Sequence, residues 1–320
     1  MIDLRSDTLT KPPREMLAAM ADAEVGDEQY REDPTVNELQ RRMAELLGHE
    51  AALFVPTATM ANQIALRAQT TPGAKLLAEE RTHVMVYELG GPAIHSGLVM
   101  QARPGDAGRL TPEQIEQEPE LGRGGIVVLE NTHRSSGGRI WPVEDFRAAV
   151  DAVHDRGAKL HLDGARLFNA SVGAGLEPSD WARHADSVTI CFSKGLCCPL
   201  GAVVVGTAEM IEGKGWESKF LFGGAMRQAG VLAAAALYAL DNLVDRLAED
   251  HERARRIDSD AETNFVAFED APGLQERLRQ RGMLVGNLRP GWLRAVTYNG
   301  ITDDDADAAA AILEAERVAA

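Results

Sequence analysis

Short, mostly apolar runs alternate with longer segments of helical periodicity along the first two thirds of the chain. The runs cover residues 51–55, 75–78, 98–102, 125–129, 159–162, 187–192 and 202–205. Between two of them, residues 143–156 place apolar side chains at the spacing of one helix face. Several runs have no polar alternation, so neither face of those strands can lie against water. The pattern predicts an α/β fold with a mostly parallel seven-stranded sheet covered by helices.

The flanking segments follow other patterns. Residues 1–37 are polar and irregular apart from a short amphipathic helix at 15–21. Thr35 and Glu38 have the spacing of a capping box, which predicts a helix from there to about residue 47, ended by Gly48.

The last third predicts a second, smaller unit. An alanine-rich helix at 231–240 is expected to continue as a charged helix towards Arg256. Expected strands at 264–268, 283–285 and 293–298, with helices at 273–281 and from Asp303, form a small α+β domain. We therefore expect a large domain at 1–245, which includes the N-terminal segment, and a small domain at 246–320.

Charge and cysteine content narrow the class of protein. Acidic residues outnumber basic ones 49 to 33 and give a net charge of −16, which disfavours binding to nucleic acid. No apolar run approaches the roughly 20 residues of a membrane span, and the start carries no apolar signal segment. The clustered cysteines Cys191, Cys197 and Cys198 lack the paired spacing of a zinc site. We expect small buried thiols, no metal and a reduced, cytoplasmic setting.

Lys194 occupies the turn between the last two strands of the predicted seven-stranded sheet, 187–192 and 202–205. Burying an ammonium group is costly, and lysine chemistry that exploits this is Schiff-base chemistry. A surface lysine in an ordinary loop fits the same Ser-Lys-Gly sequence equally well.

Asp163 ends the preceding strand in Leu-His-Leu-Asp-Gly-Ala-Arg, one helical crossover before Lys194. Ligands of open α/β sheets bind at the carboxyl ends of strands, so these two side chains are expected near each other. A carboxylate and a lysine in that place are two fixed points of a pyridoxal phosphate site. The alternative for Asp163 alone is a helix N-cap.

Three further features are open to two interpretations. Thr57-Ala58-Thr59 begins a helix directly after a strand, which suits a phosphate, although Thr57 could simply cap the helix. His83 and His133 follow strands and could move protons or merely pack. Arg294 lies in an apolar run and needs an anionic partner, either a substrate carboxylate or a structural acid.

Motifs along the chain resemble those of the low-specificity L-threonine aldolase family, which comprises fold type I pyridoxal phosphate enzymes. They include DLRSDTLTKP, GDEQYREDPTVNELQ, AALFVPTATMANQ, THVMVYELGGPA, ENTHRSSGGRIWP, LHLDGARLFNA, CFSKGLCCPLGAVVVG and GGAMRQAGVLAAAALYAL. The resemblance extends from Met1 to about His251 and resumes at Glu262.

The resemblance implies a role for each matching position. Lys194 matches the lysine that binds the cofactor covalently, Asp163 the partner of the ring nitrogen, and His83 the histidine that stacks on the ring and can act as base. The other implied cofactor contacts are Thr57, Ala58, Thr59, Arg166 and Arg227. The implied substrate contacts are Ser6, Tyr87, Arg166 and Arg294. A homotetramer with sites at a dimer interface is implied as well.

The chain departs from the family pattern at several places. Ala58 replaces a glycine, Phe220 stands where a lysine is usual with Lys219 one place early, and the loop at 116–124 lacks a histidine. Tyr298 also replaces a histidine, and the link at 251–261 is short.

The implied reaction is retro-aldol cleavage of L-threonine, L-allo-threonine or related β-hydroxy-α-amino acids to glycine and an aldehyde. β-Elimination, racemisation or transamination on the same cofactor is the first alternative. A non-catalytic oligomeric binding protein is the second.

Overall fold

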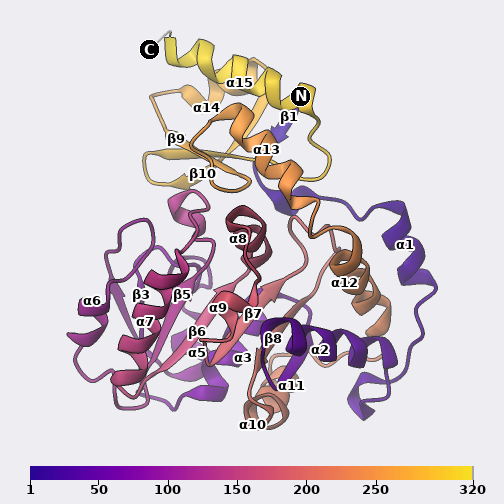
Figure 1. Ribbon diagram of the computed structural model, residues 1–320, viewed down its shortest axis with the longest axis vertical. Helices are drawn as coiled ribbons and strands as arrows, with labels where there is room; N and C mark the ends of the chain where they lie inside the picture. Colours follow the sequence, from indigo (N-terminus) through magenta and orange to yellow (C-terminus); the bar gives the residue numbers. More distant parts are fainter. Residues whose placement is uncertain (319–320) are drawn as a thin grey trace.

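The computed structural model describes residues 1–318 and contains the expected seven-stranded sheet (Figure 1). Its strand order is β2-β8-β7-β6-β5-β3-β4. The strands are β2 (Ala51–Val55), β3 (Lys75–Glu79), β4 (Val99–Arg103), β5 (Ile126–Glu130), β6 (Lys159–Gly164), β7 (Ser187–Cys191) and β8 (Ala202–Gly206). Pairing is parallel from β4 through β3, β5 and β6 to β7, whereas β8 runs antiparallel to both of its neighbours. The predicted fold class is confirmed.

In β2, β3, β5 and β8, alternate residues pack into separate cores, which explains the apolar runs of these strands. In β2, Ala52 and Phe54 face one core while Leu53 and Val55 face the other. The longer helices of the first core, with the short α9, are α2 (Pro34–Leu47), α7 (Val143–Asp155), α8 (Leu167–Ala174), α9 (Ser179–Ala182) and α12 (Gly230–Asn242). The principal helix on the second face is α3 (Ala58–Gln69). Both faces of the inner strands are therefore removed from water, whereas the edge strand β4 is partly exposed.

The remaining helices of this part are short. They are α1 (Arg14–Ala21), α4 (His83–Val86), α5 (Gly91–Ser96), α6 (Pro112–Glu116), α10 (Ala208–Met210) and α11 (Trp216–Leu221).

Two helix boundaries differ from the sequence-based expectation. The N-cap of α2 is Asp33, whose carboxylate accepts from the Val36 N–H at 3.0 Å, because Pro34 takes the first helical position. The Thr35 hydroxyl donates instead to the Glu24 carbonyl oxygen. The expected continuous helix after residue 230 is broken by a turn between α12 and α13 (Leu247–Ile257).

A second sheet of four strands lies above the first (Figure 1). Its order is β1-β10-β11-β9, formed by β1 (Ile2–Leu4), β10 (Met283–Arg289), β11 (Trp292–Val296) and β9 (Phe265–Glu269). Helices α13, α14 (Leu274–Gln280) and α15 (Asp303–Val318) pack beside it. Because β1 pairs in parallel with β10, the start of the chain is tied to the smaller sheet.

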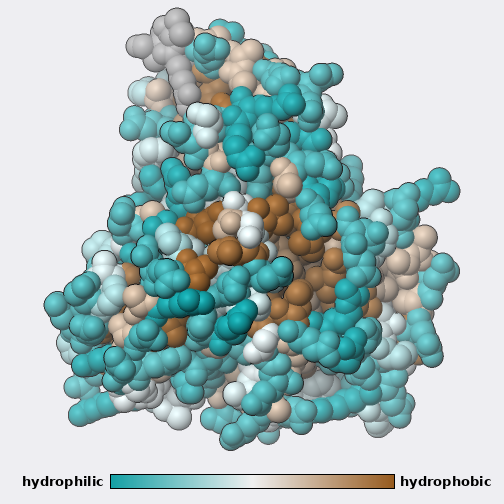
Figure 2. Space-filling view, viewed as in Figure 1, coloured by the Kyte–Doolittle hydropathy of each residue, from teal (hydrophilic) through white to brown (hydrophobic). Residues whose placement is uncertain are grey.

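Apolar side chains gather on the outer face that carries α8 and α12 (Figure 2). A groove there is lined mainly by Leu46, Phe168, Val172, Leu176, Leu240 and Val244. None of the helices in the described part of the chain has the length and apolar character needed to cross a membrane.

Candidate active site

One cavity opens where the carboxyl ends of the parallel strands meet the smaller sheet, and it collects nearly all of the predicted residues. The predicted residues that line it are Ser6, Thr57, Ala58, Thr59, His83, Tyr87, Asp163, Arg166, Lys194 and Arg294. Of the predicted site residues, Arg227 alone is not in its lining. Strand ends supply Asp163 and Lys194, the start of α3 supplies Thr57 to Thr59, and β11 supplies Arg294. The topology, rather than any local motif, makes these side chains neighbours.

Asp163 is almost fully buried and is held by hydrogen bonds. The Asn62 amide nitrogen donates to its Oδ2 at 2.9 Å, and the Ala165 N–H donates to its Oδ1 at 3.1 Å. Burial acts to raise the pKa of Asp163, but the charges of His83 and Lys194 and the Asn62 hydrogen bond outweigh burial and hold it below its ordinary value. The carboxylate is therefore ionised, as a partner for a protonated ring nitrogen has to be.

His83 is oriented by the buried carboxylate of Glu88. Its Nδ1 lies 2.9 Å from Glu88 Oε1, and since a carboxylate only accepts, Nδ1 carries the proton. Burial acts to lower the pKa of His83, yet the Glu88 hydrogen bond and the nearby carboxylates of Asp163 and Glu130 raise it overall. The second ring nitrogen, Nε2, is left for other contacts.

Asn62 links these two carboxylates into a buried network that consists of Asn62, Glu88, His161 and Asp163. Its amide nitrogen donates both to Asp163 and to Glu88 Oε1, the latter at 2.8 Å. Its oxygen accepts from His161 Nε2 at 3.0 Å, and burial lowers the pKa of His161 to about 4, which keeps that ring neutral. Each member of the network thereby fixes the orientation of the next.

The same cluster has ligand atoms close enough for a metal ion, but its hydrogen bonds fit a different use. His83, Glu88 and Asp163 offer atoms that lie within 4.8 Å of one another. The Asn62 amide points its N–H groups at both carboxylates, where a cation would be repelled. We therefore interpret the cluster as a hydrogen-bond network.

Lys194 follows β7 in a turn fixed by the Thr10 hydroxyl, which donates to the Lys194 carbonyl oxygen at 2.8 Å. Its side chain is half-buried and reaches the cavity. Within residues 1–318 no carboxylate oxygen lies within ion-pair distance of its ammonium group. Strands β6 and β7 are adjacent, with Asp163 opposite Thr189, so the lysine and the aspartate come from neighbouring strand ends as predicted.

The start of α3 offers donors for an anion. Thr57 caps the helix, with its hydroxyl accepting from the Met60 N–H at 3.2 Å. The first N–H groups of a helix lack intrahelical partners, and here they are the N–H groups of Ala58 and Thr59 at the cavity. Ala58 is helical and has no positive φ, so alanine in place of glycine leaves the backbone donor available.

The two predicted arginines of the cavity differ in their partners. Arg166 forms a bidentate pair with buried Asp7 through Nε and Nη2, at 2.7 Å and 2.6 Å, and also lines the cavity. That pair, despite the opposing effect of burial, lowers the pKa of Asp7 to about 2. Arg294 is also buried, but its Nε and Nη1 have no hydrogen-bond partner in the described chain. Burial and the charges of Arg134 and Arg166 lower the pKa of Arg294 to about 10.

Tyr87 and Ser6 complete the predicted set. The Tyr87 ring lies 5.5 Å from that of His83, and the guanidinium of Arg134 stacks over it at 4.3 Å. The Ser6 hydroxyl accepts from the Thr8 hydroxyl at 2.8 Å.

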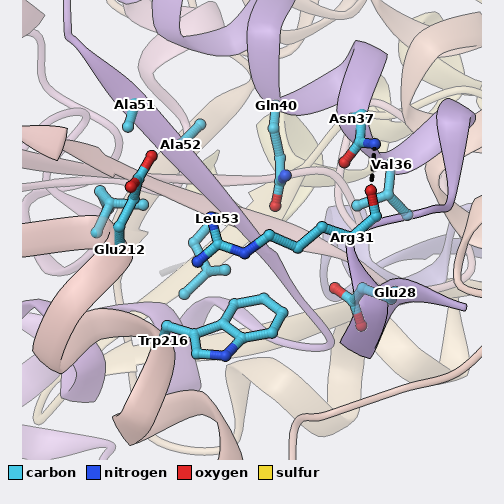
Figure 3. A pocket seen from close by; sticks show the side chains of 11 residues that line it. Glu28, Arg31, Val36, Asn37, Gln40, Ala51, Ala52, Leu53, Glu212 and Trp216 are labelled. Atoms are coloured by element: carbon cyan, nitrogen blue, oxygen red, sulfur yellow. Dashed lines mark hydrogen bonds between the residues drawn. The ribbon is translucent and has the colours of Figure 1, made fainter.

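Arg227 lies outside the cavity in the single chain, where its Nη1 is 3.3 Å from the Asp27 carboxylate. The neighbouring Lys219 is fully buried in an ion pair with Glu28, so the early lysine serves the fold. Arg31, which stacks over Trp216 at 4.9 Å, and Glu28 line a small separate pocket there (Figure 3).

His133 and the cysteines have packing roles. His133 is buried, with Nε2 3.2 Å from the Glu79 carboxylate, and is absent from the cavity lining. All three cysteines are free and buried, as expected, and Cys191 borders the cavity.

Sequence reasoning missed several residues of the site. Asn62 follows Ala58 by four residues, so helical spacing alone places it on the same face of α3. Glu130 is the last residue of β5 and lies opposite Asp163 near the end of β6, so its position after an apolar run could have identified it. Glu88 lies in a bend and Arg134 in a short 3-10 helix after β5, and neither segment has a sequence pattern that shows where its side chains point.

Known proteins are similar to this chain over most of its length. Residues 3–276 match the family described as beta-eliminating lyases. A low specificity L-threonine aldolase from Escherichia coli is 40% identical over 93% of this chain and 94% of its own. One from Arabidopsis thaliana is 38% identical over 95% and 93%.

The chain belongs to the low-specificity L-threonine aldolase family. Solved structures support the fold of this family member. A threonine aldolase from Leishmania major superposes with a TM-score of 0.84 at 19% identity, over the whole of both chains. Serine palmitoyltransferase from Sphingomonas wittichii reaches 0.77 at 18% identity, over 99% and 87%. The fold is that of fold type I, shared by enzymes of different activity.

Proposed function

We propose that this enzyme is a pyridoxal phosphate-dependent aldolase that cleaves L-threonine, L-allo-threonine and related β-hydroxy-α-amino acids to glycine and an aldehyde. The observation that carries the proposal is a buried arginine without an acidic partner, Arg294, in one cavity with Lys194 and ionised Asp163. An amino-acid carboxylate is the ligand that such an arginine lacks.

The residues present fit the cofactor. Asp163 would hold the ring nitrogen, Lys194 would bind covalently, and the start of α3 would hold the phosphate. The ring of His83 is the aromatic side chain that the buried network orients for stacking. When bound, pyridoxal phosphate supplies an electron sink for the bond that breaks at Cα.

The protein side chains then divide the work on the substrate. Arg294 binds the carboxylate through Nε and Nη1, and Ser6 adds a hydroxyl. Arg166 is held in place by its ion pair with Asp7 and forms part of the cavity wall. His83 Nε2, directly or through one water, removes the proton of the β-hydroxyl, since Nδ1 is held by Glu88.

The test is product analysis with the purified, cofactor-loaded enzyme on threonine, allo-threonine, phenylserine and serine. Release of glycine and acetaldehyde from threonine supports the proposal. The family description as beta-eliminating lyases favours a second candidate, β-elimination, whose product from serine is pyruvate. D-Amino acid formation would indicate racemisation, and absence of any product together with no cofactor uptake would indicate a binding protein.

We also propose a homotetramer in which Arg227 contributes to the cofactor site across a dimer interface. Support comes from its position outside the cavity of its own chain and from the apolar face of Figure 2. Light scattering tests the assembly. Mixing inactive Lys194→Ala and Arg227→Gln chains tests the shared site, because hybrids would regain one intact site.

Two further proposals concern organisation. Residues 1–245 and 246–320 are proposed as domains, with support from the two separate sheets and with β1 as the tie between them. Limited proteolysis near the α12–α13 turn tests this division. Cytoplasmic residence is supported by three free thiols, and cell fractionation tests it.

A further inference from the structure

Arg134 is a second arginine at the cavity that has no acidic partner. It lies just beyond the end of β5 and lines the cavity with a half-buried side chain. Its guanidinium stacks over the Tyr87 ring at 4.3 Å and donates to the Tyr87 hydroxyl at 2.5 Å. Among residues 1–318 no carboxylate lies within ion-pair distance of it.

The nearest acid of the same segment is already occupied. Glu130 accepts from the backbone N–H of His83 at 2.7 Å and from the backbone N–H of Arg134 at 2.8 Å. Its carboxylate therefore fixes the loop and leaves the Arg134 guanidinium unpaired. Acidic residues outnumber basic ones in this protein, which has a net charge of −16, so a cavity arginine without an acidic partner is unusual and suggests an anionic ligand.

Arg134 and Arg294 act on each other. The charge of Arg134 is, after burial, the largest cause that lowers the pKa of Arg294. Two unpaired like charges at one cavity repel each other, and a ligand with two carboxylates would relieve both. One carboxylate on Arg294 leaves Arg134 for a second anionic group of the same ligand.

The position of Arg134 indicates which part of the substrate it meets. Tyr87 contacts both the His83 ring, at 5.5 Å, and the Arg134 guanidinium. In the proposed function, on which this inference rests, His83 acts at the β-hydroxyl. Arg134 is therefore on the side of the other substituent at Cβ.

We propose that Arg134 determines specificity for β-hydroxy-α-amino acids whose Cβ carries a second carboxylate, of which β-hydroxyaspartate is the smallest. Cleavage breaks the Cα–Cβ bond, moves the hydroxyl proton to the base and places a proton on Cα. The products are glycine and glyoxylate, with no net oxidation or reduction. The competing explanation is that Arg134 only holds Tyr87 in place.

The experiment compares kcat/KM for β-hydroxyaspartate and for threonine within each variant of the cofactor-loaded enzyme. The variants are the unaltered chain, Arg134→Gln, Arg134→Lys and the control Arg81→Gln. Arg81 is an exposed neighbour that pairs with Glu80 and is not in the cavity lining. Glyoxylate and acetaldehyde are measured with glycine as the common product.

The unaltered enzyme should prefer β-hydroxyaspartate over threonine by about tenfold or more, the effect of one charge-assisted contact. Arg134→Gln should lower that ratio by about 10- to 100-fold through KM, Arg134→Lys should keep part of it, and Arg81→Gln should not change it.

Cleavage of threonine without a preference for β-hydroxyaspartate would overturn the inference and leave the proposed function standing. An unchanged ratio in Arg134→Gln would assign the residue to holding Tyr87. Absence of aldehyde from every substrate would overturn the proposed function and this inference with it. If Arg134→Gln does not fold, the kcat/KM ratio of the unaltered enzyme and of Arg134→Lys for the two substrates still tests the inference.

Discussion

The buried network and the two arginines Arg134 and Arg294, here called the arginine pair, lie at the same cavity. The charges of the network have hydrogen-bond partners in the protein, whereas the charges of the two arginines have no acidic partner. In the network, Asp163 and Glu88 accept from Asn62, whose oxygen accepts from His161. In the arginine pair, Arg294 leaves Nε and Nη1 without a partner, and Arg134 has only the Tyr87 ring and hydroxyl.

This difference separates a part of the site that is fully formed without a ligand from a part that needs an anionic ligand to complete its contacts. A satisfied network holds its geometry before any ligand arrives. An unpaired buried cation is unfavourable for folding, so its presence points to an anionic ligand that completes it. In the proposed function, the region for the cofactor ring is thus organised in advance, and the region for the substrate is left incomplete.

The comparison depends first on the cavity holding the cofactor, and Lys194→Ala tests this with the largest expected effect. Cleavage should fall by about three orders of magnitude or more, since the covalent attachment is lost. The visible absorbance of the loaded protein should disappear together with it. The control is Lys159→Ala, at the opposite end of β6 from Asp163, where the exposed amine only pairs with Asp186. A Lys194→Ala protein with unaltered absorbance and activity would remove the basis of the site.

A matched pair of arginine variants sharpens the comparison next. Arg294→Met should raise KM for threonine by about 100-fold while the melting temperature stays the same or rises, because an unpaired buried charge is removed. Arg166→Met should instead lower the free energy of unfolding by about 3 kcal/mol, because it leaves Asp7 buried and unpaired.

Steady-state kinetics and thermal unfolding of both proteins check this pair. Cofactor absorbance should be retained in Arg294→Met, which distinguishes a lost substrate contact from a collapsed site. A loss of stability in Arg294→Met as large as that in Arg166→Met would show that Arg294 has a structural partner and would contradict the comparison.

The sequence predicts the strands of the large sheet and the residues at their ends better than it predicts the direction of each strand. Mostly apolar runs predicted every strand of the large sheet, and burial on both faces explains the absence of polar alternation in strands such as β5. The single helical crossover between two strand ends placed Asp163 and Lys194 on neighbouring strands. The antiparallel direction of β8 was not predictable, since an apolar run carries no information on strand direction.

The partners of charged side chains were less predictable. The family resemblance gave Arg166 and Arg294 the same role, and Asp7, which pairs with Arg166, is far from it along the chain. No sequence pattern identified Arg134. Its guanidinium lacks an acidic partner because the Glu130 carboxylate accepts from backbone N–H groups instead, and this follows only from the tertiary structure. Such pairings follow from the tertiary structure of loops, which local patterns do not encode.

A smaller effect concerns acid stability and tests the satisfied Asp7–Arg166 pair. Asp7 has a pKa of about 2 in the fold against an ordinary 3.8, so its stabilisation is complete above about pH 4 and is lost as the pH falls towards 2. The unaltered protein should lose about 2 kcal/mol across that interval that Asp7→Asn does not lose. Urea unfolding at several pH values measures the difference. Asp3→Asn, in an exposed pair with Arg5, is the control, and equal slopes in all three proteins would contradict the assignment.

The smallest effect tests how the network reaches the reacting atoms. The Glu88 carboxylate raises the pKa of His83, so Glu88→Gln should lower that pKa and move the acidic limb of the pH–activity profile to lower pH. The maximal rate should fall by about three- to tenfold, because the amide holds the ring less firmly and gives a weaker base. The control is Glu80→Gln, an exposed glutamate on the same segment. A limb that stays in place while the rate falls would mean that Glu88 only orients the ring, and a limb that moves to higher pH would assign the titration to a group other than His83.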